Sequence, residues 1–363
     1  MCLQVQALCD IGASTKTTVE GEDGGALRKR CIGEKGIGFK SVFAVSETPY
    51  VRSNWFSFRF EKGAAQGIGC LVPHWVDPAT FPTPESTLVQ QPETVQRQTV
   101  GENEAYPGTS IVLPIQERKG GKKMWETIAE LDPLVLLFLR QLRVLTVTRD
   151  PALDPTLPKK QKQKKKQRGA DAAEMSEADG TAYRRLIQKE GALPAILIRD
   201  TGATAASAEQ LRAFNVFQHS AAVPGRVIAA TPTKQHSQTE ISCAFPLAAD
   251  GSADASSVQN LFVFLPTRPY GLRFPLHAEF MLPSSREEVL RGGKWNKWLA
   301  EQAVPEAFIA AVQTVFTKPL PPAAATAAGT PPEELLRKTW YRFVPRRSVR
   351  VLFFCFSVIF NRK

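Results

Sequence analysis

The amino-acid sequence predicts an α+β protein with two folded domains. Its 363 residues are enough for two domains with sizeable cores, and 43% of them are hydrophobic. Helix-like and strand-like stretches occur on both sides of a lysine-rich stretch. We expect a first α/β domain at 1–149, a basic linker at 150–180 and a second α/β domain at 181–318. A Pro/Ala-rich linker at 319–332 and a C-terminal tail at 333–363 follow.

Positive charge is concentrated in one segment. The net charge is +11, and Lys159–Arg168 holds seven positive charges without an acidic residue. The remainder, 11 − 7 = +4, is mildly basic, so the charge is weak support for a nucleic-acid-binding surface. A solvated insert, a nuclear-localisation signal and a non-specific RNA contact all fit the segment. It has no aromatic residue on which a base could stack.

Cysteine usage indicates a reduced protein. None of the six cysteines forms a C-x-x-C pair and the four histidines are scattered, which argues against a zinc site and a disulfide framework. The N-terminus lacks the pattern of a signal peptide, and the apolar run 351–360 is too short to cross a bilayer. We expect a cytoplasmic or nuclear location and no membrane partner.

The chain begins with a predicted helix. Val5, Leu8, Cys9 and Ile11 have helical spacing, and Ser14-Thr15 ends the pattern. Residues 17–30 are polar and glycine-bearing, which is typical of a surface loop.

A glycine-rich stretch follows and precedes a second apolar helix face. Phe39, Val42 and Phe43 have the i, i+3, i+4 spacing of a buried face. Glycines before a helix let the backbone approach a ligand and aim free N–H groups at it, where the helix dipole favours an anion. We therefore predict a phosphate cradle made by the N–H groups of 36–39. A glycine-rich turn that caps a core helix is the alternative.

Two common phosphate loops do not fit. A Walker A loop places Lys directly after its last Gly, but Phe39 stands between Gly38 and Lys40. A Rossmann loop needs Gly at the position of Ser41 and a strand before Gly36, and neither is found.

The rest of the first domain reads as strands and one long helix. Alternation and β-branched residues predict strands at 51–60, 70–72, 110–113 and 143–148. A helix is expected over 124–142, with Pro133 favouring a new start inside it. We expect the strand at 143–148 to close the first sandwich.

The second domain has its own strands and helices. The predicted strands are 239–245, 260–265 and 272–281. The predicted helices begin at Ser284 and at Trp295, the latter reaching Phe316.

These stretches resemble a known family when taken in order. The stretches are Ala7–Lys16, Cys31–Val45, Ser53–Phe60, Leu71–Asp77 and Gly108–Pro114. They resemble the ATP-binding module of the sacsin and plant NO VEIN proteins, within the gyrase, heat-shock-90 chaperone, histidine kinase and MutL (GHKL) ATPase superfamily. Phe264–Phe274 and Leu282–Val289 extend the resemblance. It implies a GHKL (Bergerat) α/β sandwich followed by a middle, S5-like α/β domain.

The resemblance also implies a site for ATP and Mg²⁺. The implied nucleotide-binding residues are Ser14, Thr15, Lys16, Gly33, Glu34, Lys35, Gly36, Ile37, Gly38, Phe39 and Thr109. Ser14–Lys16 would lie near the phosphates at the lid, and the Thr109 hydroxyl beside the adenine. Ordinary turns before a helix or a strand are the alternative for each.

Arg286 is the one catalytic candidate. Ser285-Arg286-Glu287 resembles the loop of heat-shock-90 chaperones whose arginine reaches the γ-phosphate. The alternative is a capping box made by Ser284 with Glu287, or by Ser285 with Glu288, which leaves Arg286 as an exposed residue in the first helical turn.

The superfamily also uses groups that we do not find in register. A helical Glu orients water, an Asn holds Mg²⁺ and an Asp-x-Gly-x-Gly turn binds adenine, all ahead of the segment that begins at Ala7. We expect a partial, chaperone-like ATP-binding module with weak or undetectable nucleotide binding and no ATP hydrolysis. A non-catalytic interaction scaffold, in the nucleus or cytoplasm, is the alternative. The expected partners are nucleotide and unidentified proteins, with nucleic acid only through Lys159–Arg168.

Overall fold

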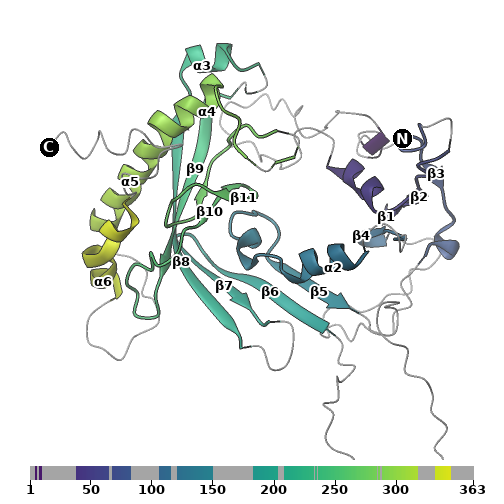
Figure 1. Cartoon of the computed structure of the whole chain (residues 1–363), viewed down its shortest axis with the longest axis horizontal. Coiled ribbons are helices and arrows are strands. Elements are labelled where there is room, and N and C mark those ends of the chain that lie inside the picture. Colours follow the sequence, from purple (N-terminus) through teal and green to yellow (C-terminus); the bar gives the residue numbers. More distant parts are fainter. Residues whose placement is uncertain are drawn as a thin grey trace, which may run out of the picture. The chain divides into compact units, whose positions relative to one another are not determined.

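The chain forms two compact units, Met1–Glu130 (unit 1) and Leu131–Lys363 (unit 2), in a computed structural model (Figure 1). Both contain helices and strands, which confirms the α+β fold class. The structure describes residues 5, 8–9, 38–64, 68–82, 106–115, 121–149, 183–202, 208–232, 234, 236–283, 285–286, 288–317 and 332–344. The predicted loop at 17–30, the lysine-rich segment and the apolar tail lie outside these residues.

Unit 1 contains a four-stranded antiparallel sheet in the order β3-β2-β1-β4. Its strands are β1 (Tyr50–Asn54), β2 (Phe56–Arg59), β3 (His74–Trp75) and β4 (Tyr106–Val112). The strand predicted at 51–60 is confirmed as a hairpin that turns at Trp55, and the strand predicted at 110–113 is confirmed with an earlier start. The strand predicted at 70–72 is wrong, because Ile68–Leu71 form turns and β3 follows them.

A short helix packs on this sheet. The 3₁₀ helix η1 (Phe39–Ala44) buries Phe43 with Val51, Phe58 and Phe60 in one apolar core. Val5, Leu8 and Cys9 belong to the same cluster, and all three are helical as the spacing predicts. A further 3₁₀ turn, η3 (Pro78–Thr80), begins at Asp77, whose Oδ1 accepts from the Ala79 N–H at 2.8 Å.

The helix expected over 124–142 is wrong as one continuous element, whereas the new start expected at Pro133 is confirmed. Helix α2 spans Gly121–Ala129, and a separate 3₁₀ turn, η5, spans Pro133–Leu136. Asp132 Oδ1 accepts from the Leu134 N–H at 2.9 Å, so a capped new start with Pro at the first position replaces helix continuation.

Strand β5 (Val144–Arg149) is confirmed as a strand, but it belongs to the other unit. It pairs antiparallel with β6 (Tyr183–Ala192) at the edge of the sheet of unit 2. It therefore does not close the first sandwich, and the two units divide after Glu130 rather than at residue 149.

Unit 2 is built on an eight-stranded sheet in the order β11-β10-β12-β9-β8-β7-β6-β5. Its other strands are β7 (Ala195–Asp200), β8 (Gln210–Ala222), β9 (Gln238–Leu247), β10 (Asn260–Val263), β11 (Leu265–Pro269) and β12 (Leu276–His277). Neighbours are antiparallel except β10 and β12, which are parallel. The strands predicted at 239–245 and 260–265 are confirmed, whereas the one expected over 272–281 shortens to β12.

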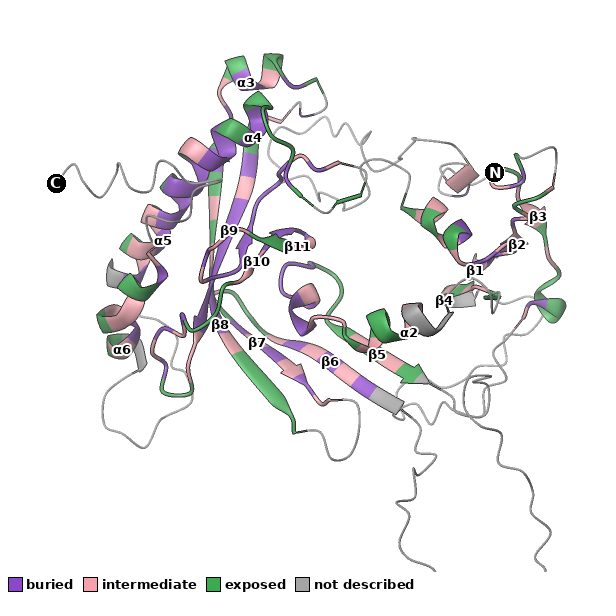
Figure 2. Ribbon diagram, viewed as in Figure 1, coloured by how far each residue is buried: buried purple, intermediate pink, exposed green. Residues whose placement is uncertain are grey.

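Helices cover one face of this sheet. They are α3 (Gly225–Ala229), α4 (Lys294–Trp298), the π-helical turn η7 (Leu299–Ala303), α5 (Val304–Thr317), α6 (Pro332–Thr339) and the 3₁₀ turn η8 (Trp340–Phe343). Helix α5 runs along β8 and β9, and buried residues concentrate where they meet (Figures 1 and 2). Within this core Phe274 stacks on Phe308 at 5.5 Å. The helix predicted at 295–316 is confirmed.

The opposite face of β10 has a smaller core. Phe262 points away from the helices, because Leu261 and Val263 on either side belong to the helix-side cluster. Its ring lies 5.0 Å from that of Phe138, which follows η5 and stacks on His277.

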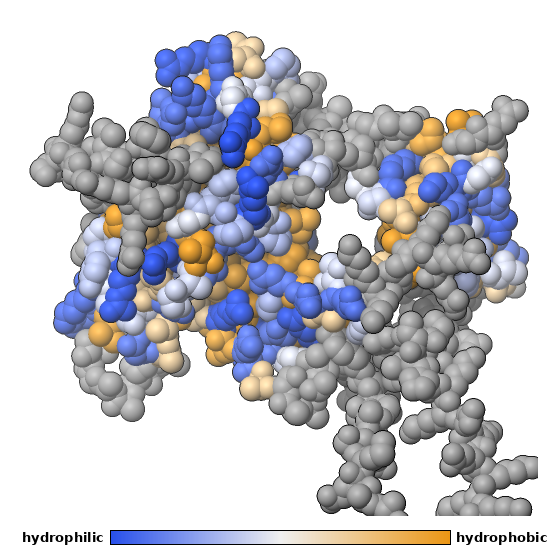
Figure 3. Space-filling view, in the orientation of Figure 1, coloured by the Kyte–Doolittle hydropathy of each residue, from blue (hydrophilic) through white to orange (hydrophobic). Residues whose placement is uncertain are grey.

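Hydrophilic side chains cover α3 and α4 on the face of unit 2 shown in Figure 3. In the part of the chain that the structure describes, no helix has the length and apolarity needed to cross a membrane.

Candidate nucleotide site

The predicted cradle is described from Gly38 onward. Gly38 precedes η1 with φ −58° and ψ −45°, so it already has helical dihedrals, and no side chain caps the helix among the described residues. The first N–H groups of a helix have no partner inside it. The start of η1 therefore offers backbone donors, as the cradle requires.

Gly38 is a glycine without a local structural need for one. Its φ is negative, and no described heavy atom lies within 4 Å of where a Cβ would stand. Gly69 is the contrast, because a Cβ there would lie 1.8 Å from the Glu61 carbonyl oxygen. The missing side chain at Gly38 leaves open space beside the first turn of η1, whereas the one at Gly69 is required by packing.

Aromatic packing fixes η1 on the sheet. The Phe39 ring lies 5.6 Å from that of Phe60, and Phe43 and Phe58 lie 6.1 and 5.6 Å from the same ring. The side chain of Phe39 thus packs in the core, and its backbone N–H is the group that the predicted cradle uses.

Lys40 is a structural residue in this arrangement. Its Nζ donates to the carbonyl oxygens of Leu8 at 2.5 Å and Cys70 at 2.8 Å, and it lies 5.3 Å from the centre of the Phe60 ring. Lys62 Nζ likewise donates to the Phe43 carbonyl at 3.1 Å. These lysines tie η1 to its surroundings, in agreement with the exclusion of a Walker A lysine.

Thr109 lies on β4 and is exposed. Its hydroxyl is 2.7 Å from that of Ser53, its register partner on β1. A hydroxyl donates once and accepts twice, so this bond leaves Thr109 further capacity for a ligand. Ser53 is a residue that sequence reasoning missed, since its relation to Thr109 depends on strand register.

The other nucleotide-site residues expected from the sequence lie outside the described residues. They are Ser14, Thr15, Lys16, Gly33, Glu34, Lys35, Gly36 and Ile37. Their roles stay predictions. Within the described part of the chain, no group of three or more His, Cys, Asp or Glu residues could hold a metal ion.

Arg286 lies in a turn of unit 2, not in a helix. It has φ +59°, its N–H donates to the Pro283 carbonyl at 3.1 Å, and its Nη2 donates to the Val263 carbonyl at 3.0 Å. The helix expected from Ser284 is wrong for the described residues, because 285–286 and 288–293 are not helical and α4 begins at Lys294. Ser285 and Glu288 do not start a helix, whereas Ser284 and Glu287 lie outside the described residues. A contact of Arg286 with a γ-phosphate stays a prediction.

Asn296 holds the segment that contains Arg286. Its Oδ1 accepts from the Met281 N–H at 2.7 Å, and its Nδ2 donates to the carbonyls of Met281 and Leu290 at 2.9 Å. Tyr270 accepts from the Val289 N–H at 2.7 Å. These side-chain bonds hold both ends of the loop that contains the turn at Arg286.

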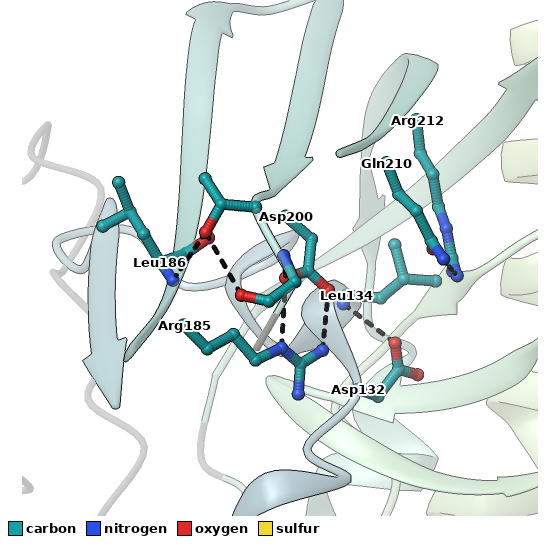
Figure 4. A network of polar contacts seen from close by, with 9 residues as sticks. Asp132, Leu134, Arg185, Leu186, Asp200, Gln210 and Arg212 are labelled. Carbon is teal, nitrogen blue, oxygen red and sulfur yellow. Dashed lines mark hydrogen bonds and ion pairs between the residues drawn. The ribbon is translucent and has the colours of Figure 1, made fainter. Parts of the chain in front are cut away.

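A buried ion pair stabilises the sheet of unit 2 (Figure 4). Arg185 on β6 donates from Nε and Nη2 to the two carboxylate oxygens of Asp200 at 3.0 and 2.7 Å. Burial raises the pKa of Asp200, but the hydrogen bonds from Arg185 and the Gly202 N–H outweigh it, so the pKa lies below 3.8. Burial and nearby Arg143 lower the pKa of Lys189, whose Nζ donates to the Leu139 carbonyl.

Comparison with known proteins gives one informative similarity. No family model matches the chain, and no solved structure matches it. Protein NO VEIN of Arabidopsis thaliana is 29% identical over 322 residues, which are 87% of this chain and 10% of that protein. The chain therefore spans about a tenth of the length of this relative. The similarity supports the NO VEIN part of the resemblance, and the sacsin and GHKL parts stay predictions.

Proposed function

We propose that the chain is a partial ATP-binding module of a NO VEIN-type protein, with a chaperone-like conformational role in a longer protein. The N–H groups of Gly38 and Phe39, together with those of Gly36 and Ile37, bind the phosphates of ATP. Mg²⁺ accompanies the nucleotide. Binding by this chain is weak, because backbone donors make most of the contacts.

The open start of η1 is the observation that carries the proposal. Neither a positive φ nor a close neighbour among the described residues explains the glycine at 38. A side chain there would stand beside the uncapped N–H groups that a phosphate needs. The absence of one is therefore best explained by the close approach of a ligand.

Turnover is not part of the proposal. Lys40, the first lysine after the loop, is bound to two backbone carbonyls. A phosphate cradle stabilises charge, but water still needs a general base to orient it, a contribution of roughly 10²–10⁴-fold. The described residues of the site supply backbone donors and hydroxyls rather than such a base, so the proposal assigns them binding alone.

An interaction scaffold is the second candidate. Trp55 and Trp75 in unit 1 are 64% and 56% exposed, and the ring centres of Phe56 and Trp75 lie 6.1 Å apart. Exposed aromatic residues are enriched at protein interfaces. This surface favours a protein partner, with or without nucleotide.

Thermal unfolding titrated with Mg²⁺-ATP tests the proposal. ATP should raise the melting temperature of the wild type and of Gly38→Ala, whose small side chain keeps the same backbone conformation. It should not raise that of Gly38→Val, in which a branched side chain stands in the open space. No response in any of the three removes the ATP proposal and leaves the scaffold.

A further inference from the structure

Unit 2 contains a cavity of about 550 Å³ that is separate from the residues of the nucleotide site. Three segments line it: Ala253–Ser256 after β9, Arg273 ahead of β12, and Tyr341, Arg342 and Val344 at the end of η8. Sites for small molecules typically have volumes of roughly 300–1,000 Å³, so this cavity has a suitable size.

The floor of the cavity is apolar and firmly held. Ala253 and Ala255 of the lining belong to the main core and are 2% and 8% exposed. Thr339 Oγ1 accepts from the Ala253 N–H at 2.8 Å, and Thr339 also donates to the Leu335 carbonyl. Small side chains on an anchored backbone explain why the space stays open instead of being filled.

Two guanidinium groups face this floor from different segments. Arg273 Nη1 donates to the Ala255 carbonyl, and Arg342 Nη1 lies 3.5 Å from the Ala253 carbonyl. A guanidinium has five N–H donors, so each arginine keeps donors beyond its bond to the loop in the described part of the chain. Two planar forks on one cavity match the oxygens of a phosphate or a carboxylate.

The remaining polar groups leave the cavity positive. Asp254 is the one acidic residue of the lining, and its Oδ1 accepts from the Ser256 N–H at 3.2 Å and the Ser256 hydroxyl at 2.6 Å. The two arginines and this one aspartate give the lining a net charge of +1. Asp250 lies outside the lining; hydrogen bonds from Ser252 chiefly lower its pKa, and Arg342 contributes to the shift.

We propose that this cavity binds a small molecule through a phosphate or carboxylate group held between Arg273 and Arg342. The apolar floor takes the body of the ligand, and the half-exposed Tyr341 ring covers it from the rim. The proposal does not depend on nucleotide binding, because all of these residues lie in unit 2.

Arginine modification of the full chain tests it directly. Phenylglyoxal reacts with accessible guanidinium groups, and mass spectrometry locates the adducts. Inorganic phosphate or acetate, compared with chloride at equal ionic strength, should slow modification of Arg273 and Arg342 but not of the exposed Arg291 outside the cavity. The anion that protects more strongly shows whether the site prefers a phosphate or a carboxylate group. Equal protection of all three arginines, or of none, overturns the proposal.

A variant gives the second arm. In Arg342→Gln the anion should bind about tenfold more weakly, because one charged hydrogen-bonding partner is lost. Protection of Arg273 should then need a correspondingly higher anion concentration. Arg291→Gln and Gly38→Val are the matched controls and should leave that protection unchanged. Unchanged protection of Arg273 in Arg342→Gln would contradict a site shared by the two arginines. Loss of that protection in Gly38→Val would mean that the anion binds elsewhere, which also contradicts the proposal.

Discussion

The hydroxyl of Thr109 lies 2.7 Å from the hydroxyl of Ser53, its register partner on the neighbouring strand. The bond links β1 to β4, and β4 carries Thr109, the residue expected beside the adenine. It fixes one side of the Thr109 hydroxyl and leaves the other free to meet a ligand. Ser53 is therefore a positioning residue for Thr109 in the proposed nucleotide site.

A double-mutant cycle checks this link. Ser53→Ala and Thr109→Val should each destabilise unit 1 slightly, and the double variant by less than their sum. Cross-strand pairs contribute about 0.2–1 kcal/mol, so the coupling should be about 0.5 kcal/mol. Urea unfolding of the four proteins measures it, and strict additivity would show that the two hydroxyls do not interact.

The left-handed backbone of Arg286 predicts an unusual order of stabilities. Arg286→Ala and Arg286→Gly both lose the bond to the Val263 carbonyl. Glycine relieves the Cβ clash at φ +59°, which costs about 1–2 kcal/mol for other residues. Arg286→Gly should therefore be more stable than Arg286→Ala by about 1 kcal/mol in denaturant unfolding. The opposite order would mean that the turn changes conformation in the variants.

The Arg185–Asp200 pair predicts an acid-dependent stability. The pKa of Asp200 is lower in the folded than in the unfolded protein, so its contribution is present above 3.8 and is lost as pH falls toward the folded value. Asp200→Asn removes the carboxylate that accepts two hydrogen bonds from the buried Arg185 and should cost about 3 kcal/mol at pH 7. The difference between wild type and variant should shrink below pH 4. A difference that is constant from pH 7 to pH 3 would contradict the cause given for the shift.

Phosphate release from Mg²⁺-ATP should remain at the background of the buffer. The proposal gives the chain backbone donors for phosphate but no group that orients water. Wild type and Gly38→Val should therefore release phosphate at the same rate. Faster release by the wild type would mean that the chain supplies a catalytic group that the resemblance does not identify.

Local patterns carry much of the fold. The apolar spacing of Phe39, Val42 and Phe43 predicts the packed face of η1, and the alternation around Phe58 predicts strand structure over 51–60, although not the turn at Trp55. The break at Asp132-Pro133 has a signal too, since an Asx cap followed by Pro is typical of a new helix start.

Pairing and tertiary contacts could not be predicted in the same way. Strand β5 has the composition of any strand, and only its register with β6 assigns it to unit 2. Asn296 reads as an ordinary helical residue, although its amide holds Met281 and Leu290. Lys40 stands next to a glycine loop, yet its ammonium binds the Leu8 carbonyl, 32 residues away. Each of these depends on residues far apart in the sequence.

Amide chemical shifts test the central claim, that the start of η1 binds the phosphates of a nucleotide. A ¹⁵N-labelled chain is titrated with ATP, with pyrophosphate and with adenosine, and the amide signals of Gly38 and Phe39 are followed. ATP and pyrophosphate should shift both signals in the wild type, whereas adenosine should not, and Gly38→Val should abolish the response of Phe39. If the amide signals of Gly38 and Phe39 do not shift at millimolar ATP, or shift equally with adenosine, the phosphate cradle is wrong.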